Sequence, residues 1–198
     1  MHRFLGRFVI GAGALLIAAT AHAQGTAGSS GRPFKLGGAL GATVPLGDFS
    51  DDADLGFHLG GLVEYKPASV PVNLRGELTY HRNGLGADAF QEGANITDGH
   101  VSMLSFIANA FFPFGDAAST ARPYAIAGLG LYHVSIVGDI PGTDDTRERS
   151  STDFGINLGG GFTFNLSGFE TFVEARYHSV FTNDSNTSFM PISFGFKF

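Results

Sequence analysis

The chain ends in SFMPISFGFKF, Ser188 to Phe198. Successive side chains of an extended strand point to opposite faces, so this stretch has two very different sides. One side is apolar: Met190, Ile192, Phe194, Phe196 and Phe198. The other is small or polar: Pro191, Ser193, Gly195 and Lys197. Because an exposed apolar edge strand aggregates in water, the pattern favours a strand that faces lipid in a closed transmembrane β-barrel.

The composition agrees with a barrel in a membrane. The 198 residues suffice for one domain with a substantial core. Charged residues make up only 15% of the chain, against about 25% in soluble domains. Mean hydropathy is nevertheless low, at +0.12, and no apolar run after residue 23 approaches the roughly 20 residues of a membrane-spanning helix. A membrane protein without such helices crosses the bilayer with strands.

The first 23 residues have the pattern of a secretory signal peptide. Met1 to Ala23 combines a basic start, an apolar core and a small-residue ending, Ala21-His22-Ala23. The apolar core is too short for a membrane anchor, so cleavage is expected before Gln24. Residues 24–33 are then a flexible mature N-terminus, and residues 34–198 form the barrel.

Charge and cysteine content exclude several classes of protein. Without Arg3 and Arg7, 10 basic and 18 acidic residues remain, a net charge of −8. An acidic chain of this kind does not bind nucleic acid, which requires a basic face. The chain has no cysteine, so it has neither a disulfide framework nor a lipid-anchored N-terminal cysteine.

Alternating segments of strand length recur from Phe34 onward, with turn or loop signals between them. There are eight: 34–44, 55–66, 72–82, 100–112, 124–137, 153–166, 169–181 and 188–198. Their lengths suit the ~9–11 residues of a tilted membrane strand. If the chain ends lie in the periplasm, the long loops 45–54, 83–99 and 138–151 are extracellular. The predicted fold is an all-β, eight-stranded antiparallel up-and-down transmembrane barrel.

The small interior of an eight-stranded barrel decides which face of each strand points outward. A soluble lipocalin-like barrel has the same alternation with the faces exchanged, but the interior of eight strands barely holds its own side chains. The aromatic face is therefore predicted to point outward. In the fifth segment this applies to Tyr124, Ile126, Tyr132, Val134 and Ile136, opposite His133 and Ser135. All five tyrosines then lie outward as interfacial girdles: Tyr65, Tyr80, Tyr124, Tyr132 and Tyr177.

The fourth segment is ambiguous, because both of its faces are apolar near the middle. An inward Ser105 and Asn109 are preferred. That choice sends the following side chains outward: Leu104, Phe106, Ala108, Ala110 and Phe112.

Four inward charges are predicted to meet inside the barrel. Two of them, Arg75 and Glu77, lie on the third segment, and the other two, Glu174 and Arg176, lie on the seventh. The alternation of side chains directs all four toward the lumen, at a similar distance from the strand ends. Unpaired buried ions are costly, so two acids and two bases in a narrow lumen are expected to form a lumen charge network. Such a neutral plug closes the barrel to continuous flow.

The chain resembles the small outer-membrane β-barrel domain family, which includes the eight-stranded membrane domain of outer membrane protein A and the opacity-type adhesins. The resemblance covers residues 34–198 and rests on Gly41–Phe49, Pro123–Leu131, Glu174–His178 and the terminal strand. It implies a location in the outer membrane of a Gram-negative bacterium, in contact with lipid and lipopolysaccharide. It also implies that Ile192, Phe194, Phe196 and Phe198 form the insertion signal that the barrel-assembly machinery reads.

Patterns that suggest catalysis or ligand binding have simpler explanations. His178 and Ser179 are similar to the residues of an outer-membrane lipid A deacylase, but neighbours in a strand point to opposite faces. The inward histidines His58, His81, His133 and His178 include no i, i+2 pair to begin a metal site. The Gly128–Gly130 and Gly159–Gly161 runs precede no helix that could bind a phosphate. No catalytic, cofactor-binding or metal-binding residue is predicted.

The sequence favours a non-enzymatic outer-membrane barrel with a structural or adhesion-type role, in which extracellular loops carry a ligand site. A small-solute channel is the first alternative, and a lipid A-modifying enzyme is the second. Acidic loop residues leave open whether divalent cations bind: Asp51, Asp52, Asp54, Asp144 and Asp145.

Overall fold

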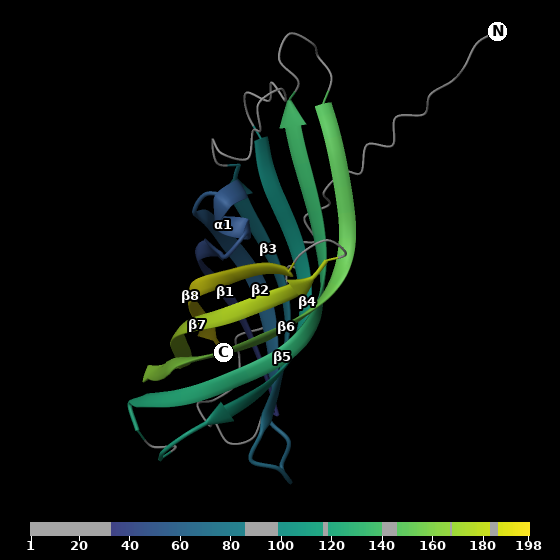
Figure 1. The fold of residues 1–198 in the computed structure, drawn as a ribbon. Helices are drawn as coiled ribbons and strands as arrows, with labels where there is room; N and C mark the ends of the chain where they lie inside the picture. Colours follow the sequence, from purple (N-terminus) through teal and green to yellow (C-terminus); the bar gives the residue numbers. More distant parts are fainter. Residues whose placement is uncertain (1–32, 86–98, 117–118, 140–145, 167, 183–185) are drawn as a thin grey trace, which may run out of the picture. The chain divides into compact units, whose positions relative to one another are not determined.

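The protein forms a closed barrel of eight antiparallel strands, each paired with its neighbours in sequence (Figure 1). The structure is a computed structural model and describes residues 33–85, 99–116, 119–139, 146–166, 168–182 and 186–198. The predicted signal peptide and residues 24–32 lie outside the described residues. Within these ranges no helix is long and apolar enough to cross a membrane.

The strands confirm the predicted fold class. They are β1 (Phe34–Leu46), β2 (Gly56–Tyr65), β3 (Asn73–Gly84), β4 (Gly99–Pro113), β5 (Ala121–Asp139), β6 (Thr146–Leu166), β7 (Phe169–Phe181) and β8 (Asn186–Lys197). One helical turn, α1 (Phe49–Asp52), lies between β1 and β2. The pattern of alternation therefore located every strand.

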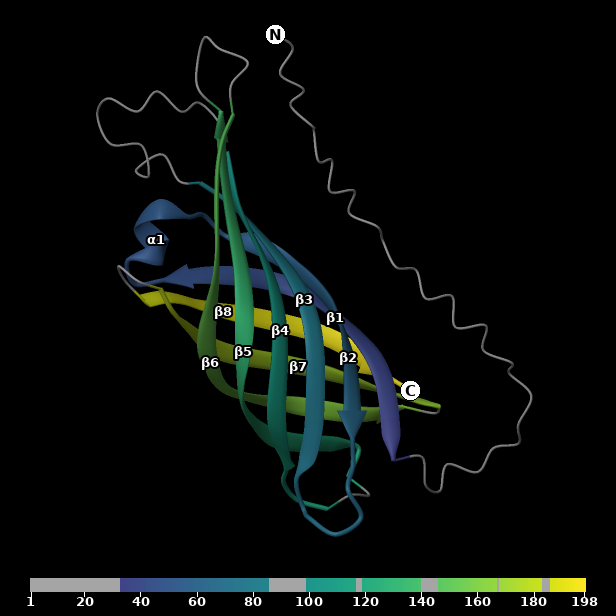
Figure 2. The same ribbon diagram turned by 90° about the vertical axis from the view of Figure 1, so that its right-hand side faces the viewer.

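The seam between β1 and β8 closes the barrel (Figure 2). Leu40 lies opposite Phe194, and the pairing runs from Gly37–Lys197 to Leu46–Ser188. Beyond Lys197, the Phe198 amide donates to the Leu36 carbonyl at 2.9 Å, and the Phe198 carbonyl accepts from the Leu36 amide at 3.1 Å. The terminal strand is thus paired to its last residue and leaves no free edge there.

The strands are strongly tilted, as their register shows. One circuit of the barrel can be traced by starting at Thr152 on β6 and moving from each residue to its partner on the next strand. The circuit ends on β6 again, at Phe162. The partners along the way are His133, Leu104, Tyr80, Leu59, Leu40, Phe194 and Val173. One circuit therefore shifts the register by ten residues, from 152 to 162. A stagger of this kind goes with strand tilts of about 35–45°.

The sixth strand begins earlier than predicted. Arg147, Glu148 and Arg149 were predicted in a loop, but β6 starts at Thr146, which lies opposite Asp139 of β5. In Figure 1 these two strands continue well past β7 and β8. Outside the bilayer a strand needs no apolar face, so the alternation that marks the membrane segment gives no signal there.

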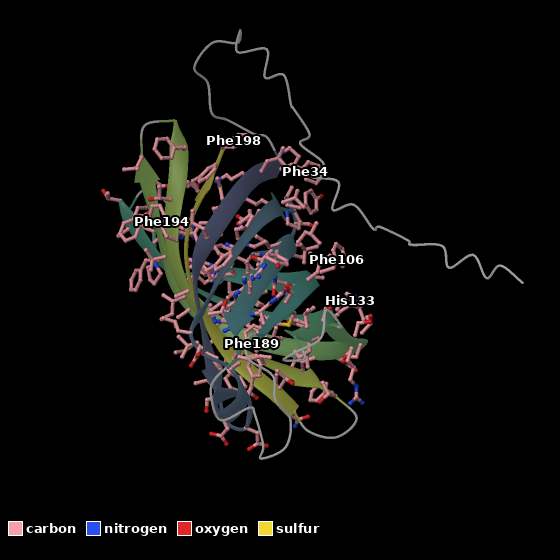
Figure 3. All side chains as sticks on the ribbon, turned by 90° about the horizontal axis from the view of Figure 1, so that it is seen from above. Phe34, Phe106, His133, Phe189, Phe194 and Phe198 are labelled. Atoms are coloured by element: carbon pink, nitrogen blue, oxygen red, sulfur yellow. The ribbon has the colours of Figure 1, made fainter. Side chains whose placement is uncertain are left out.

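The lipid-facing surface is apolar, and Figure 3 shows Phe106 and Phe194 projecting outward from the barrel. Phe106 is 61% exposed and Phe194 is 54% exposed. The ambiguous strand β4 has the preferred direction, with Ser105 and Asn109 buried inside. Three tyrosines lie on the outer face as predicted: Tyr65, Tyr80 and Tyr177.

The predicted direction of β5 is wrong. Tyr124, Ile126 and Tyr132 are buried in the lumen, whereas Leu129, Leu131 and His133 are exposed. Two of the five tyrosines are therefore not interfacial, and the predicted inward direction of His133 is also wrong. The room for an inward ring on β5 depends on the residues of the neighbouring strands, which the sequence of β5 alone does not give.

Glycines on neighbouring strands make the room for these rings. Tyr124 lies directly opposite Gly161, and a Cβ on Gly161 would come within 2.8 Å of the Tyr124 hydroxyl oxygen. A Cβ on Gly195 would lie 2.2 Å from Cζ of Phe172. Each large inward ring thus occupies the volume that a side chain on the facing glycine would fill.

Replacing Gly195 with alanine is expected to destabilise the barrel by about 1–3 kcal/mol, the usual cost of overpacking. Phe172 is 1% exposed and cannot move aside. Gly61→Ala is the matched control, because the nearest atom to its Cβ is 3.9 Å away. Urea unfolding in detergent micelles measures the difference in stability between the two variants. Equal unfolding midpoints would show that the lumen has enough free volume beside Phe172 to accept a methyl group.

Candidate functional site

Four charged side chains from β3 and β7 meet in the middle of the lumen. The Arg75 Nη1 atom lies 2.7 Å from Glu174 Oε2 and 3.4 Å from Glu77 Oε1. The Arg176 Nη1 atom lies 2.6 Å from Glu77 Oε2, and its Nε lies 2.8 Å from Glu174 Oε1. All four side chains are at most 7% exposed. The structure thus brings together the four residues of the predicted lumen charge network.

The network continues toward the end of the barrel where β1 begins and β8 ends. Lys197 on β8 lies 2.9 Å from Glu64 Oε2 and 3.3 Å from Glu170 Oε2. Lys35 pairs with Glu170, and Arg75 Nη2 lies 3.5 Å from Glu64 Oε2. Apart from Arg75, these side chains were not part of the predicted network of four central charges, because their meeting with it depends on the stagger of the strands.

The complete network contains four basic and four acidic side chains and is neutral: Lys35, Arg75, Arg176 and Lys197 with Glu64, Glu77, Glu170 and Glu174. Every carboxylate touches at least one cation. This matters because breaking one buried pair leaves a charge without compensation.

Aromatic rings enclose the Arg75 guanidinium. Its Cζ lies 4.7 Å from the Phe111 ring centre, 5.1 Å from that of Phe172 and 5.6 Å from that of Tyr124. These distances suit cation–π contacts. The Tyr124 hydroxyl also donates to Glu174 Oε2 at 2.7 Å. This role of Tyr124 was not predicted, because the ring was expected to point outward; the sequence signal for an inward ring is Gly161, which lies opposite it on β6.

A layer of histidines lies on the other side of the charges. The Thr43 Oγ1 atom lies 3.1 Å from His58 Nδ1 and 3.0 Å from His81 Nδ1. One hydroxyl has one hydrogen, so it donates to one ring and accepts from the other. Two neutral rings at this threonine are therefore opposite tautomers. His58 Nε2 is also 2.9 Å from Ser193 Oγ, so polar side chains join this layer to β8 as well.

Aromatic contacts continue this layer toward the end of the barrel that holds α1. The Phe189 ring stacks on His178 with centroids 4.8 Å apart and meets the edge of His81 at 5.3 Å. The Tyr132 hydroxyl lies 2.9 Å from His178 Nδ1. Phe49 of α1 packs against the buried cluster that contains Tyr132 and Phe189. The turn in the first loop therefore covers the lumen.

Little free volume remains between the two layers. A cavity of about 20 Å³ is lined by Glu77, Arg176, His58, His81 and His178, among others. A single water needs about 10–15 Å³, so this cavity holds about one water molecule. Nearer the end where β1 begins and β8 ends, a larger space of about 210 Å³ is lined by Lys35, Glu170 and Lys197.

The histidines do not gather into a metal site. Within the part of the chain that the structure describes, no group of three or more His, Asp or Glu side chains is placed to hold a metal ion. His133 lies on the outer face, with Nδ1 2.9 Å from Thr152 Oγ1. Asp144 and Asp145 lie outside the described residues.

His178 and Ser179 do not form a nucleophile–base pair. His178 is 1% exposed in the lumen, and Ser179 has the opposite parity on β7, level with the lipid-facing Ile156. A base activates a hydroxyl only within hydrogen-bond reach. These two residues therefore do not supply the arrangement that a deacylase requires.

The predicted insertion signal forms the outer face of β8. Ile192 is 44% exposed, Phe194 54%, Phe196 47% and Phe198 68%. The last two rings stack with centroids 6.3 Å apart. All four side chains are therefore directed away from the lumen and lie beside the seam with β1.

Known proteins share this architecture. The outer membrane protein beta-barrel domain family matches the chain over residues 12–198. The crystal structure of Neisserial surface protein A is similar, with 20% identity and a TM-score of 0.59 over 84% of this chain and 96% of that one. The crystal structure of a major outer membrane protein from Thermus thermophilus has 14% identity and a TM-score of 0.56, over 84% of this chain and 99% of that one. No curated protein matches the sequence.

The two structural likenesses establish the fold alone, whereas the family match extends over most of the chain and agrees with the closed barrel and its apolar outer surface. The chain belongs to the outer membrane protein beta-barrel domain family and is a protein of the bacterial outer membrane.

Proposed function

We propose that this protein is a closed, non-catalytic scaffold of the outer membrane that acts through its extracellular loops in surface interaction. The observation that carries the proposal is the filled lumen. Eight mutually paired charged side chains occupy the part of the lumen between Arg176 and Lys35. The cavity between Arg176 and the histidine layer has about the volume of one water molecule. The lumen is therefore closed at the level of Arg176, although a space of about 210 Å³ remains nearer Lys35 and Lys197. A barrel that is closed in this way leaves its outer surface and its loops as the sites of function.

The energetics of the lumen argue against the small-solute channel. A conducting path would separate Arg75 and Arg176 from Glu77 and Glu174, which lie within hydrogen-bond distance of them. Opening would also displace the aromatic rings around Arg75. Such a rearrangement exposes several buried ions at once, and each loses a partner.

The extracellular direction is supported by the distribution of connections. The longest gap between strands runs from Gly84 to Gly99, at the same end as α1 and the extended part of β5 and β6. The opposite end has the start of β1, the end of β8 and the short turn between β6 and β7. Barrels of this class have short periplasmic turns and longer extracellular loops.

Planar-bilayer recording tests the closed state. The purified protein is expected to give no steady conductance at neutral pH, because the charge network excludes a continuous water column. Steady open-channel currents from the unmodified protein would reject the scaffold proposal and favour the channel.

Epitope labelling tests the surface role in the same strain. A tag inserted near Gly93 or Thr143, both outside the described residues, is expected to be accessible to antibody on intact cells. A tag near Ser119, which precedes β5 at the end of the barrel where β8 finishes, is expected to be labelled only after the cells are permeabilised. The reverse pattern would place the proposed surface loops in the periplasm.

A further inference from the structure

The outer face of the barrel carries a charged side chain, Arg82 on β3. Among the strand side chains that the structure describes, Arg82 is the one charged group that points away from the lumen, and it is exposed. Among the described residues, its guanidinium has no hydrogen-bond or ion-pair partner. An unpaired cation beside a hydrocarbon surface is costly unless an anion meets it.

Arg82 lies where the apolar belt ends. Leu78 and Tyr80 come before it on the same face of β3, and Tyr80 is two residues or about 6–7 Å away along the strand. The Tyr80 hydroxyl lies 3.0 Å from Ser102 Oγ on β4. Tyrosines mark the interface between hydrocarbon and headgroups, so the guanidinium lies at the level of lipid headgroups.

The surface around Arg82 is hollow and has mixed chemistry. An open groove of about 740 Å³ is lined by Leu55, Phe57, Arg82, His100 and Val137, with three glycines between them. Phe57 lies directly opposite Arg82, and its side chain is 50% exposed. His100 lies opposite Gly84, which makes it a diagonal neighbour of Arg82 on the same face, with Cα atoms roughly 7–8 Å apart.

We propose that this groove binds the phosphorylated sugar headgroup of lipid A from the surrounding outer leaflet. The Arg82 guanidinium holds a phosphate through paired hydrogen bonds, and the His100 ring donates to the same group. The apolar Leu55 and Phe57 contact the first part of the acyl chains. The groove is wider than one phosphate requires and lies at the extracellular end of the proposed orientation, and both features favour lipid A over a phospholipid.

The test compares lipids on the intact purified protein by native mass spectrometry from detergent micelles. The three probes are bisphosphorylated lipid A, enzymatically dephosphorylated lipid A and phosphatidylglycerol. The unmodified protein is expected to bind bisphosphorylated lipid A at least about tenfold more tightly than dephosphorylated lipid A, since one charge-assisted hydrogen bond corresponds to about that factor or more. It is also expected to bind lipid A more tightly than phosphatidylglycerol, whose single phosphate reaches Arg82 but whose small headgroup leaves much of the groove empty.

Arg82→Gln is expected to remove most of this preference, and Arg82→Lys to retain part of it because the charge remains without the planar fork. Arg149→Gln is the matched control, because Arg149 is exposed on the opposite face of β6 from Ser150 and Thr152. Heat-modified migration in gels verifies that each variant is folded. Unchanged binding in Arg82→Gln, or equal binding of phosphatidylglycerol by the unmodified protein, would overturn the proposal.

Discussion

Reversing the charge of Arg176 is expected to lower the free energy of unfolding by about 3–5 kcal/mol, the usual cost of breaking a buried ion pair. Arg176 contacts both Glu77 and Glu174, so Arg176→Glu places a third carboxylate beside two others. The rearranged lumen is also expected to admit water and small ions. Urea unfolding in lipid vesicles measures the stability, and planar-bilayer recording measures the conductance.

A double-mutant cycle separates the ion pair from general packing. Arg176→Gln and Glu77→Gln each leave one unbalanced charge in the otherwise neutral network. The double variant restores neutrality, so its loss of stability is expected to be smaller than the sum of the two single losses. Arg149→Glu is the control for charge reversal at an exposed site. An Arg176→Glu protein with unchanged midpoint and unchanged conductance would refute the proposed plug.

Removal of Phe198 is expected to abolish accumulation in the outer membrane while secretion across the inner membrane continues. Its ring is 68% exposed and contributes little to the lumen, whereas its backbone makes two hydrogen bonds to Leu36. Phe198→Ala retains those backbone bonds and removes only the ring. If the ring is the insertion signal, both variants remain in the periplasm, as cell fractionation and heat-modified migration will show.

Refolding in vitro distinguishes recognition from stability. Purified Phe198→Ala is expected to refold into detergent with nearly normal stability, because the lost ring faces lipid. Phe169→Ala is the matched control, since Phe169 is an outward ring on β7, 46% exposed and at the same end of the barrel. Normal outer-membrane levels of Phe198→Ala would show that the terminal ring is not read during assembly.

Alternation alone predicted most of this fold because the bilayer imposes it. Every strand inside the membrane needs one lipid-compatible face, and the terminal Phe194, Phe196 and Phe198 show that requirement most clearly. The beginning of β6 at Thr146 was missed for the complementary reason. Above the membrane both faces of a strand meet water, so polar residues such as Arg149 and Ser150 carry no strand signal.

The sequence predicted which charged side chains of the candidate site point into the lumen, but it did not predict which aromatic side chains do. Parity placed Arg75, Glu77, Glu174 and Arg176 inside, because a charge on the lipid face is costly. Tyr124 and Tyr132 gave no such signal, since a tyrosine is acceptable both at the lipid interface and in a packed interior. Their direction depends on whether the adjacent strand has a glycine at the level of the ring, and that pairing requires the register of β5 with β6.

The exchange of volume between glycines and inward rings links pairs of positions that are far apart in the sequence. Gly195 and Phe172 fill one shared space, as do Gly161 and Tyr124. In a relative with a larger residue at the position of Gly195, we therefore expect a smaller residue at the position of Phe172. Natural selection for a well-packed lumen would then act on both positions of a pair together. Single replacements are expected to be lost from the family, whereas compensated double replacements are expected to persist.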